Sequence, residues 1–244
     1  MTTSDRAGNT NAMLIRFLPL ITGLLPIIAI HASLFVAINT GSIPACIPYI
    51  DGCTSISATG RYEPASFIFK PAMLSEWLIM VVYWLFNAAW LRSLADDTNG
   101  RIGRWMVVSG ITGALALVLY VTFLGAQVPF YEFMRRFGIY LYFLFSVIAQ
   151  IMLAWNTLVI AKHRELPSVR RIARWQMFLA LTPFALGALN LILKVTLENP
   201  DPPENVIEWI FALLMHVYFL LTWFNWRATG FDGRFTVWLS LIHI

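Results

Sequence analysis

One polar stretch, Cys46-Ile-Pro-Tyr-Ile-Asp-Gly-Cys-Thr-Ser-Ile-Ser-Ala-Thr-Gly-Arg-Tyr-Glu-Pro-Ala-Ser-Phe-Ile-Phe69, separates the first two apolar segments of the chain. It contains two cysteines, several turn-forming residues and the run Ile56-Ser-Ala-Thr-Gly60. Nearly everything around it is compatible with hydrocarbon. Because polar residues in a membrane protein gather where lipid tolerates them, we expect the chemistry of this chain in or beside this loop.

The composition places the chain in the membrane class. Hydrophobic residues make up 59% of the sequence and charged residues 12%, which is half of the roughly 25% found in soluble domains. The mean hydropathy is +0.69 and the pI is near 9.3. The basic residues cluster in short segments beside apolar runs, as membrane topology requires, so the positive charge predicts no nucleic-acid partner.

Six apolar segments have the roughly 20 residues needed to cross about 30 Å of hydrocarbon. Each is expected to be a helix, because lipid offers no partner to free backbone groups. The first is interpreted as a retained span, since it is too long for a signal-peptide core and lacks an Ala-x-Ala cleavage site. The sequence therefore predicts an all-α polytopic membrane protein, a six-transmembrane-helix bundle, with spans near Leu14–Ile38, Pro71–Leu94, Trp105–Leu124, Phe137–Ile160, Trp175–Leu193 and Val206–Trp226.

Lysine and arginine are distributed unevenly between the two sides. Of the 17 basic residues, one side would hold Arg6, Arg16, Arg92, Arg101, Arg104, Lys162, Arg164, Arg170, Arg171, Arg174, Arg227 and Arg234. The other side would hold Arg61, Lys70, Arg135, Arg136 and Lys194. The richer side is cytoplasmic, so both termini are expected inside and the 46–69 loop outside. The protein is expected in the inner (plasma) membrane if bacterial, and in an endomembrane or the plasma membrane if eukaryotic.

Residues 1–235 are expected to form a single six-span membrane domain, since neither an internal repeat nor a soluble domain interrupts the apolar pattern. Residues 236–244 are set apart as a C-terminal tail. Its last residues, Leu239–Ile244, resemble adaptor read-through at the end of an assembled fragment. His243 is therefore given no weight.

Cys46 and Cys53 lie in the loop that is expected outside. In an oxidising compartment they would form a disulfide that closes the turn at Ile50–Gly52. The alternative is a pair of free thiols in a loop held without a bridge. No histidine lies in that loop and no His-x-x-x-His spacing occurs in the chain, so neither a metal nor another cofactor is expected.

The run Ile56–Gly60, Pro64 and Ile68-Phe69 resembles the first-loop signature of the FRAG/DRAM/SFK family. That signature reads roughly Pro-aromatic-Ile-Ser-x-Thr-Gly, then Pro-Pro-Glu, then a phenylalanine leading into the second span. Glu208-Trp209 at the head of the sixth span resembles the family's second mark. The six spans match as well, so the resemblance covers nearly the whole chain.

The chain departs from this pattern at two places. A cysteine-containing insert separates Pro48-Tyr49-Ile50 from Ile56-Ser57, and Glu63-Pro64-Ala65 stands in place of Pro-Pro-Glu. The cysteines are similar to those of the GPI-lipid-remodelling branch and of the N-terminal domain of the Cwh-type proteins. The resemblance implies a role in GPI-anchor lipid remodelling, membrane lipid homeostasis or autophagy control, without an assigned reaction.

The loop and the head of the sixth span give the first set of candidate residues, with two interpretations. As a rigid cap, the loop would be shaped by local hydroxyl bonds, a glycine and a proline. As a lid, it would bind a lipid headgroup, with a guanidinium offered to phosphate and an indole at headgroup depth. The candidate lipid-binding residues are Ser57, Thr59, Gly60, Arg61, Pro64, Glu208 and Trp209.

Polar residues inside the spans form the second set, because a charge in lipid is expensive and often functional. Glu76 and Asn87 are eleven positions apart, a spacing that returns to nearly the same helix face. Asn190 and Lys194 stack at i, i+4, and Lys194 could pair with Glu208 or snorkel to the surface. A lone histidine is more often a packing residue than a ligand. The candidate intramembrane polar face consists of Glu76, Asn87, Asn190, Lys194 and His216.

Three functions follow from these observations. The first is a non-catalytic multi-pass membrane protein that handles or organises membrane lipids, which would be its partners; protein partners are not predicted. The second is an intramembrane lipid acyltransferase or hydrolase that uses Glu76, Glu208 or His216. The third is a small-solute transporter, which would require repeats and broken helices. Since no catalytic motif occurs in the sequence, no catalytic residue is assigned and the first is preferred.

The basic asymmetry predicts which loops face each compartment. In a background without Cys46 and Cys53, Gly41→Cys and Asp97→Cys should react with a membrane-impermeant maleimide from opposite sides, with Gly41→Cys labelled from outside. Labelling of both positions from one side would contradict this topology.

Overall fold

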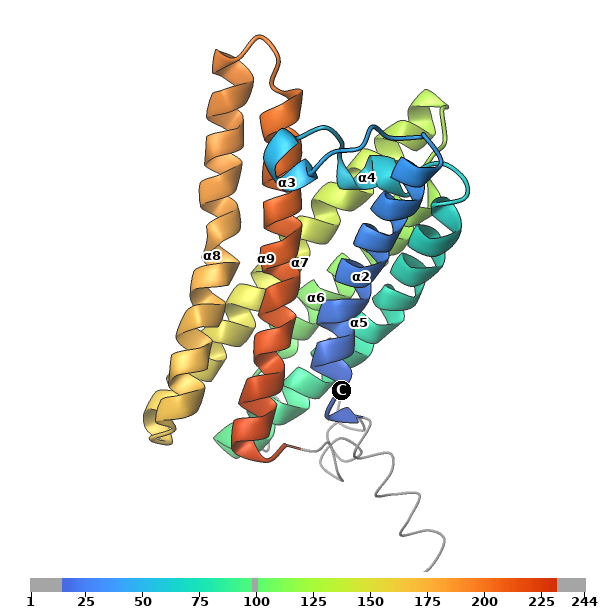
Figure 1. Ribbon diagram of the computed structural model, residues 1–244. Coiled ribbons are helices and arrows are strands. Elements are labelled where there is room, and N and C mark those ends of the chain that lie inside the picture. Colours follow the sequence, from blue (N-terminus) through green and yellow to red (C-terminus); the bar gives the residue numbers. More distant parts are fainter. Residues whose placement is uncertain (1–14, 98–100, 232–244) are drawn as a thin grey trace, which may run out of the picture.

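The computed structural model describes residues 15–97 and 101–231 (Figure 1). The C-terminal tail 236–244, and the basic residues Arg6 and Arg234 used for the topology, lie outside the described residues. Within them the chain forms helices joined by short connections.

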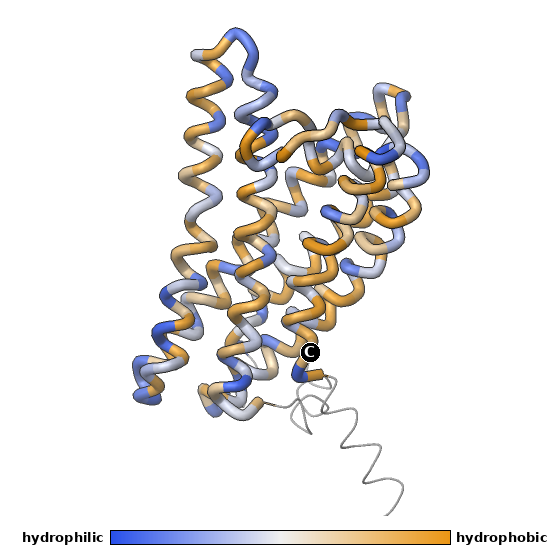
Figure 2. Tube along the Cα trace, in the orientation of Figure 1, coloured by the Kyte–Doolittle hydropathy of each residue, from blue (hydrophilic) through white to orange (hydrophobic). Residues whose placement is uncertain are grey.

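Six of these helices are long and apolar enough to cross a membrane, as the sequence predicts. Figure 2 shows hydrophobic residues along their middles and hydrophilic residues gathered toward the two ends of the bundle. Two short helices, α3 (Pro48–Asp51) and α4 (Ile56–Thr59), lie in the first loop. The six long helices are α2 (Leu18–Asn39), α5 (Ser66–Ala95), α6 (Arg104–Thr122), α7 (Pro129–His163), α8 (Pro167–Thr196) and α9 (Asp201–Thr229).

Several long helices extend beyond the predicted spans. The sequence assignment starts the fourth and fifth spans at Phe137 and Trp175, whereas α7 and α8 begin at Pro129 and Pro167. Charged residues end the part of a helix that hydrocarbon can cover, but they do not end the helix itself. A proline in the first turn loses no hydrogen bond. For the same reason the Pro202-Pro203 pair lies in the first turn of α9, and not in the connection before it.

The chain starts and ends its described bundle on the same side. Figure 1 shows α2 beginning and α9 ending at one end, which we call the termini end, while α3 and α4 cover the other. We call residues 40–65 the cap and the end that they cover the cap end. A disulfide joins Cys46 to Cys53, which confirms the predicted bridge. It fixes the segment that contains α3.

Helices α6 and α7 pack closely because small residues line their contact. A Cβ at Gly138 would lie 2.6 Å from the backbone nitrogen of Tyr120, and one at Gly113 would lie 2.9 Å from Ser146 Oγ. The Ser109 hydroxyl donates to the Phe145 carbonyl oxygen at 2.8 Å. Close backbone approach of this kind is how small residues stabilise helix pairs in membranes.

A hydrogen-bond network ties three helices together in the half of the bundle nearer the termini end. Gln176 of α8 donates to the Thr222 hydroxyl of α9 at 2.9 Å, and Asn225 donates to Gln176 Oε1 at 2.7 Å. The Tyr83 hydroxyl of α5 lies 2.7 Å from that of Thr222. All four side chains are fully buried, so each bond satisfies a group that would be costly to leave unpaired in an apolar interior.

Helix α8 packs against the bundle through only part of its length. Its buried residues are Val169, Ala173, Gln176 and Ala180, all in the half nearer the termini end. Figure 1 shows α7 and α8 close together at their termini-end connection and diverging toward the cap end. The cap-end half of α8 therefore stands apart from α7.

Two glycine-to-alanine changes should separate the tight and open parts of this bundle. Gly138→Ala should lower the free energy of unfolding by about 1–3 kcal/mol, because the α6 backbone cannot retreat from the added methyl group. Gly187→Ala on α8 meets nothing within 4 Å and should be neutral, or stabilising by up to about 1 kcal/mol through helix propensity. Unfolding of both variants in detergent micelles is the measurement. Equal stabilities would contradict the packing described for α6 and α7.

Candidate functional site: a cleft at the cap end

A cleft of about 360 Å³ lies where α7, α8 and α9 separate toward the cap end. Ser57 of α4 and Tyr120 of α6 complete its wall. The lining residues are Ser57, Tyr120, Arg135, Arg136, Ile139, Tyr140, Phe143, Pro183, Leu186, Gly187, Asn190, Glu204, Ile207, Glu208 and Phe211.

The lining is divided into a polar and an apolar part along the helices. The cap-end turns of α7, α8 and α9 contribute the polar groups, among them Arg135, Asn190 and Glu204. The next turns toward the middle of the bundle contribute apolar ones, including Phe143 and Phe211, whose rings lie 4.6 Å apart. The cleft is therefore amphipathic in the direction of the membrane normal.

Glu208 fixes the wall of the cleft to the cap. The backbone N–H groups of Ile56 and Ser57, in the first turn of α4, act as hydrogen-bond donors to its carboxylate. The Ser55 hydroxyl accepts from the Ala58 amide at the same helix end. The first amides of a helix lack intrahelical partners, so a carboxylate there satisfies them and interacts favourably with the helix dipole.

The two neighbouring polar residues of α9 hold the preceding part of the cap. Trp209 donates its indole N–H to the Thr54 carbonyl at 2.9 Å, and Asn205 donates its amide to the Gly52 carbonyl at 2.8 Å. Gly52 adopts a φ of +59°, and a Cβ there would lie 1.9 Å from the Pro202 carbonyl oxygen. Only glycine fits this contact.

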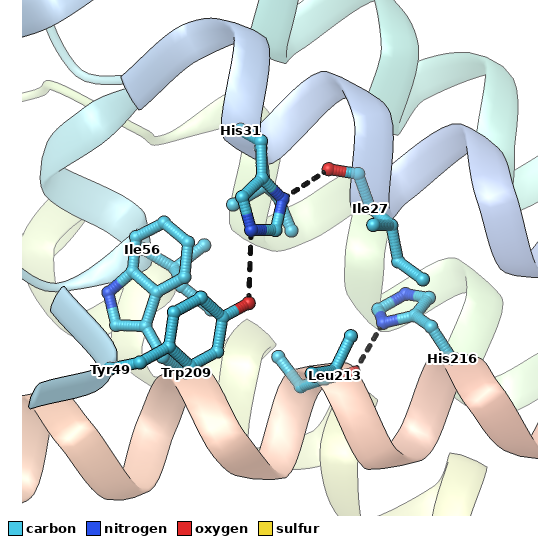
Figure 3. Close-up of a pocket in the computed structure, with 9 residues that line it drawn as sticks. Ile27, His31, Tyr49, Ile56, Trp209, Leu213 and His216 are labelled. Carbon is cyan, nitrogen blue, oxygen red and sulfur yellow. Dashed lines mark hydrogen bonds between the residues drawn. The ribbon is translucent and has the colours of Figure 1, made fainter. Parts of the chain in front are cut away.

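Aromatic packing seals this junction, as Figure 3 shows. The His31 Nδ1 lies 2.7 Å from the Ile27 carbonyl, so it carries the proton, and the Tyr49 hydroxyl donates to Nε2 at 3.1 Å. The Tyr49 and Trp209 rings lie 5.3 Å apart. Burial raises the pKa of Tyr49 above its ordinary value, which keeps the phenol neutral as the donor. The pocket that these residues line measures about 10 Å³, which is about the volume that one water molecule needs.

Two guanidinium groups converge at the mouth of the cleft. Arg61 of the cap and Arg135 of α7 each place a nitrogen 3.5 Å from the Ser57 hydroxyl oxygen. Arg61 belongs to the first set of candidates, whereas Arg135 contributes to the predictions only through its charge, which helps to assign the topology. The signal that could have identified it is the paired charge Arg135-Arg136 directly before an apolar span.

The remaining residues of the first set lie in the cap and do not line the cleft. Thr59 is buried and donates to the Ile56 carbonyl at 2.7 Å. Gly60 packs against the Phe69 ring, where an added Cβ would lie 2.1 Å from Cγ. Pro64 is exposed and follows a cis peptide bond.

The residues of the second set are divided between the cleft and the interior. Asn190 lines the cleft. Lys194 forms an ion pair with Glu204 at 2.8 Å, and not with Glu208, whose carboxylate faces α4. Asn87 is buried and accepts from the Trp226 indole at 3.2 Å.

Glu76 and His216 are buried in the interior and do not line the cleft. Neither Glu76 oxygen has a hydrogen-bond partner, and the His216 Nε2 also lacks one. His216 donates from Nδ1 to the Ala212 carbonyl at 2.6 Å. His216 and Glu208 both line an internal cavity of about 30 Å³, which is large enough for a water molecule.

No group of three or more His, Cys, Asp or Glu side chains in residues 15–97 and 101–231 is arranged to hold a metal ion. The chemistry that these residues offer is therefore that of guanidinium, amide, hydroxyl and carboxylate groups above an apolar slot.

A family model described as Frag1/DRAM/Sfk1/Cwh43P N-terminal domain matches residues 15–229. No curated protein and no solved structure matches the chain. The matched range includes all six membrane helices, the cap and both ends of the cleft.

The junction between α9 and the cap predicts the effect of one conservative change. Trp209→Phe keeps an aromatic ring but leaves the buried Thr54 carbonyl without its donor, which should destabilise the protein by about 1–3 kcal/mol. Amide hydrogen exchange of residues 52–58 should increase. Trp155→Phe, at a side chain that is 61% exposed, is the control and should change neither quantity. Unchanged exchange of the cap in Trp209→Phe would contradict the role given to this bond.

Proposed function

Since this chain belongs to the Frag1/DRAM/Sfk1/Cwh43P N-terminal domain family, we propose that it is a multi-pass membrane protein that handles membrane lipids by holding one in the cap-end cleft. The role is one of binding and presentation, without a chemical step. Membrane lipids are its partners, and they enter from the leaflet at the cap end.

One observation carries this proposal: the cleft is amphipathic and is bordered by the exposed half of α8. Phe184 and Leu191 of α8 are 56% and 67% exposed, so they would face acyl chains in a bilayer. A lipid molecule has the same division into a polar head and an apolar tail as the cleft. A pocket of a few hundred Å³ with a few polar groups is typical of small-ligand sites.

The geometry favours binding over an acyl-transfer or hydrolytic reaction. Such a reaction would need a nucleophile within hydrogen-bond reach of a base. The buried base candidates Glu76 and His216 have no hydroxyl partner in the described part of the chain. Glu208 is engaged by two backbone amides.

Transport is disfavoured for a different reason. Solute carriers commonly build their sites from discontinuous helices. Helix α8 continues from Pro167 to Thr196 through its internal Pro183. The other long helices are likewise continuous over their described lengths.

Filling the cleft tests the proposal. Gly187→Leu places an isobutyl group in the apolar part, where a Cβ meets nothing within 4 Å, so the protein should fold with unchanged stability. Its co-purified lipid, measured by mass spectrometry, should fall several-fold. Ala188→Leu makes a similar change at an exposed neighbour that does not line the cleft and should retain lipid.

Turnover should be measured on the same samples. Release of fatty acid or transfer of an acyl chain by the wild-type protein, lost in a Glu208 or His216 variant, would instead establish the enzymatic alternative. Equal lipid retention in Gly187→Leu and wild type would show that the cleft is not the lipid site.

A further inference from the structure

The chemical class of the ligand follows from the charges at the mouth of the cleft. The guanidinium groups of Arg61 and Arg135 approach one hydroxyl oxygen, each at 3.5 Å. Two like charges held this close repel each other. Neither arginine forms an ion pair with any carboxylate in the described ranges 15–97 and 101–231. An anion between them would relieve this repulsion.

The carboxylates of the cleft have other partners and form no ion pair with these arginines. Glu204 is paired with Lys194 at 2.8 Å. Glu208 accepts the amides of Ile56 and Ser57 and interacts with Arg135 only through space, without forming an ion pair with it. Lys70 adds positive charge nearby, since its Nζ and the Arg61 side chain both lie beside Gly125. The mouth therefore holds two guanidinium groups that have no ion pair among the described residues, and guanidinium groups bind phosphate oxygens.

The surroundings of the mouth indicate what the phosphate is attached to. The Asn190 amide lies on the opposite wall of the cleft, and its Oδ1 is buried without a hydrogen-bond partner. As an acceptor, Oδ1 is placed to bond a hydroxyl group adjoining the phosphate, while the Nδ2 group of the same amide can donate to an ester oxygen. Beyond it, Leu186 and Phe211 form an apolar slot. A free phosphate ion would leave both features unused.

We infer that Arg61 and Arg135 bind the phosphate of a phospholipid, with Asn190 beside its glycerol backbone and an acyl chain in the apolar slot. This inference rests on the proposed function and specifies its ligand. Arg135 is the central group because it lines the cleft itself, whereas Arg61 approaches from the cap.

Short-chain ligands test the inference on the full-length protein in maltoside micelles. Dioctanoyl phosphatidic acid and dioctanoylglycerol differ only by the phosphate, and inorganic phosphate supplies the anion alone. Arg135→Gln and Arg61→Gln should weaken binding of the phosphatidic acid about 10-fold to 100-fold and leave binding of dioctanoylglycerol unchanged. Arg135→Lys should lose less affinity, because it keeps the charge but not the planar fork. Arg171→Gln removes one exposed charge at the termini end and should have no effect.

Each outcome bears on a different part of the inference. Equal affinity of wild type and Arg135→Gln for phosphatidic acid would overturn the phosphate assignment. If Gly187→Leu still abolished binding of both lipids, the proposed lipid site would stand. Inorganic phosphate that bound as tightly as phosphatidic acid would overturn the assignment to a lipid. If neither lipid bound, or Gly187→Leu bound both normally, the proposed function itself would fail. Thermal unfolding of each apo variant serves as the folding check, and loss of the Arg135 charge should not lower its midpoint.

Discussion

The hold of α9 on the cap is the interaction on which the cap end depends. Three side chains in the first three turns of α9 bind backbone groups of the cap. Asn205 binds the Gly52 carbonyl and Trp209 binds the Thr54 carbonyl, while Glu208 accepts the amides of Ile56 and Ser57. A loop of this length has no ladder to satisfy its own amides and carbonyls. Side chains from one helix supply the missing partners, so the position of α9 determines the shape of the cap. The disulfide between Cys46 and Cys53 constrains the part of the cap that contains α3.

The two halves of the bundle are stabilised in different ways. Toward the termini end, the buried amides, hydroxyls and indoles of α5, α8 and α9 bond one another. Toward the cap end, α8 has no buried residue after Ala180, and the space beside it is the cleft. Hydrogen bonds between buried side chains hold these three helices together at the termini end, whereas a helix with few packed contacts opens at low free energy. The fold thus buries α8 against the bundle at the termini end, whereas at the cap end α8 is joined to α9 by the Lys194–Glu204 ion pair and borders the cleft.

The six helices could be predicted from the sequence because lipid admits few other structures, and the disulfide because both cysteines fall in one loop. The family resemblance put Ser57 and Glu208 into one set of candidates on the same side of the membrane, but it did not predict their contact through the first turn of α4. Arg135 was missed because one arginine among several near a membrane boundary carries no pattern of its own. Arg135 became a candidate only because its guanidinium group lies beside that of Arg61, and this proximity depends on the tertiary structure.

The cleft could not be predicted from hydropathy. The most apolar parts of α6 and α8 have the same mean hydropathy, 1.8, yet 50% of that part of α6 and only 6% of that part of α8 are buried in the bundle. In water, such different burial would demand different sequences. In a bilayer, acyl chains and neighbouring helices are equally good partners for an apolar face. The hydropathy of a helix therefore does not show whether it packs against other helices or against lipid. A helix that faces lipid over half of its length has the same mean hydropathy as one that packs in the bundle.

Because the exposed half of α8 borders the cleft, the cleft opens toward the membrane, and this decides which concentration governs its occupancy. A ligand that enters sideways is drawn from the leaflet and is already oriented and confined to two dimensions. The relevant quantity is its mole fraction among neighbouring lipids, and not its vanishing concentration in water. Under the proposed function, every abundant lipid would compete for the same opening, so a modest intrinsic affinity would suffice to fill the cleft and selectivity would decide which lipid species is bound. Changes in leaflet composition would be converted directly into changes in the bound population, with no soluble messenger between them.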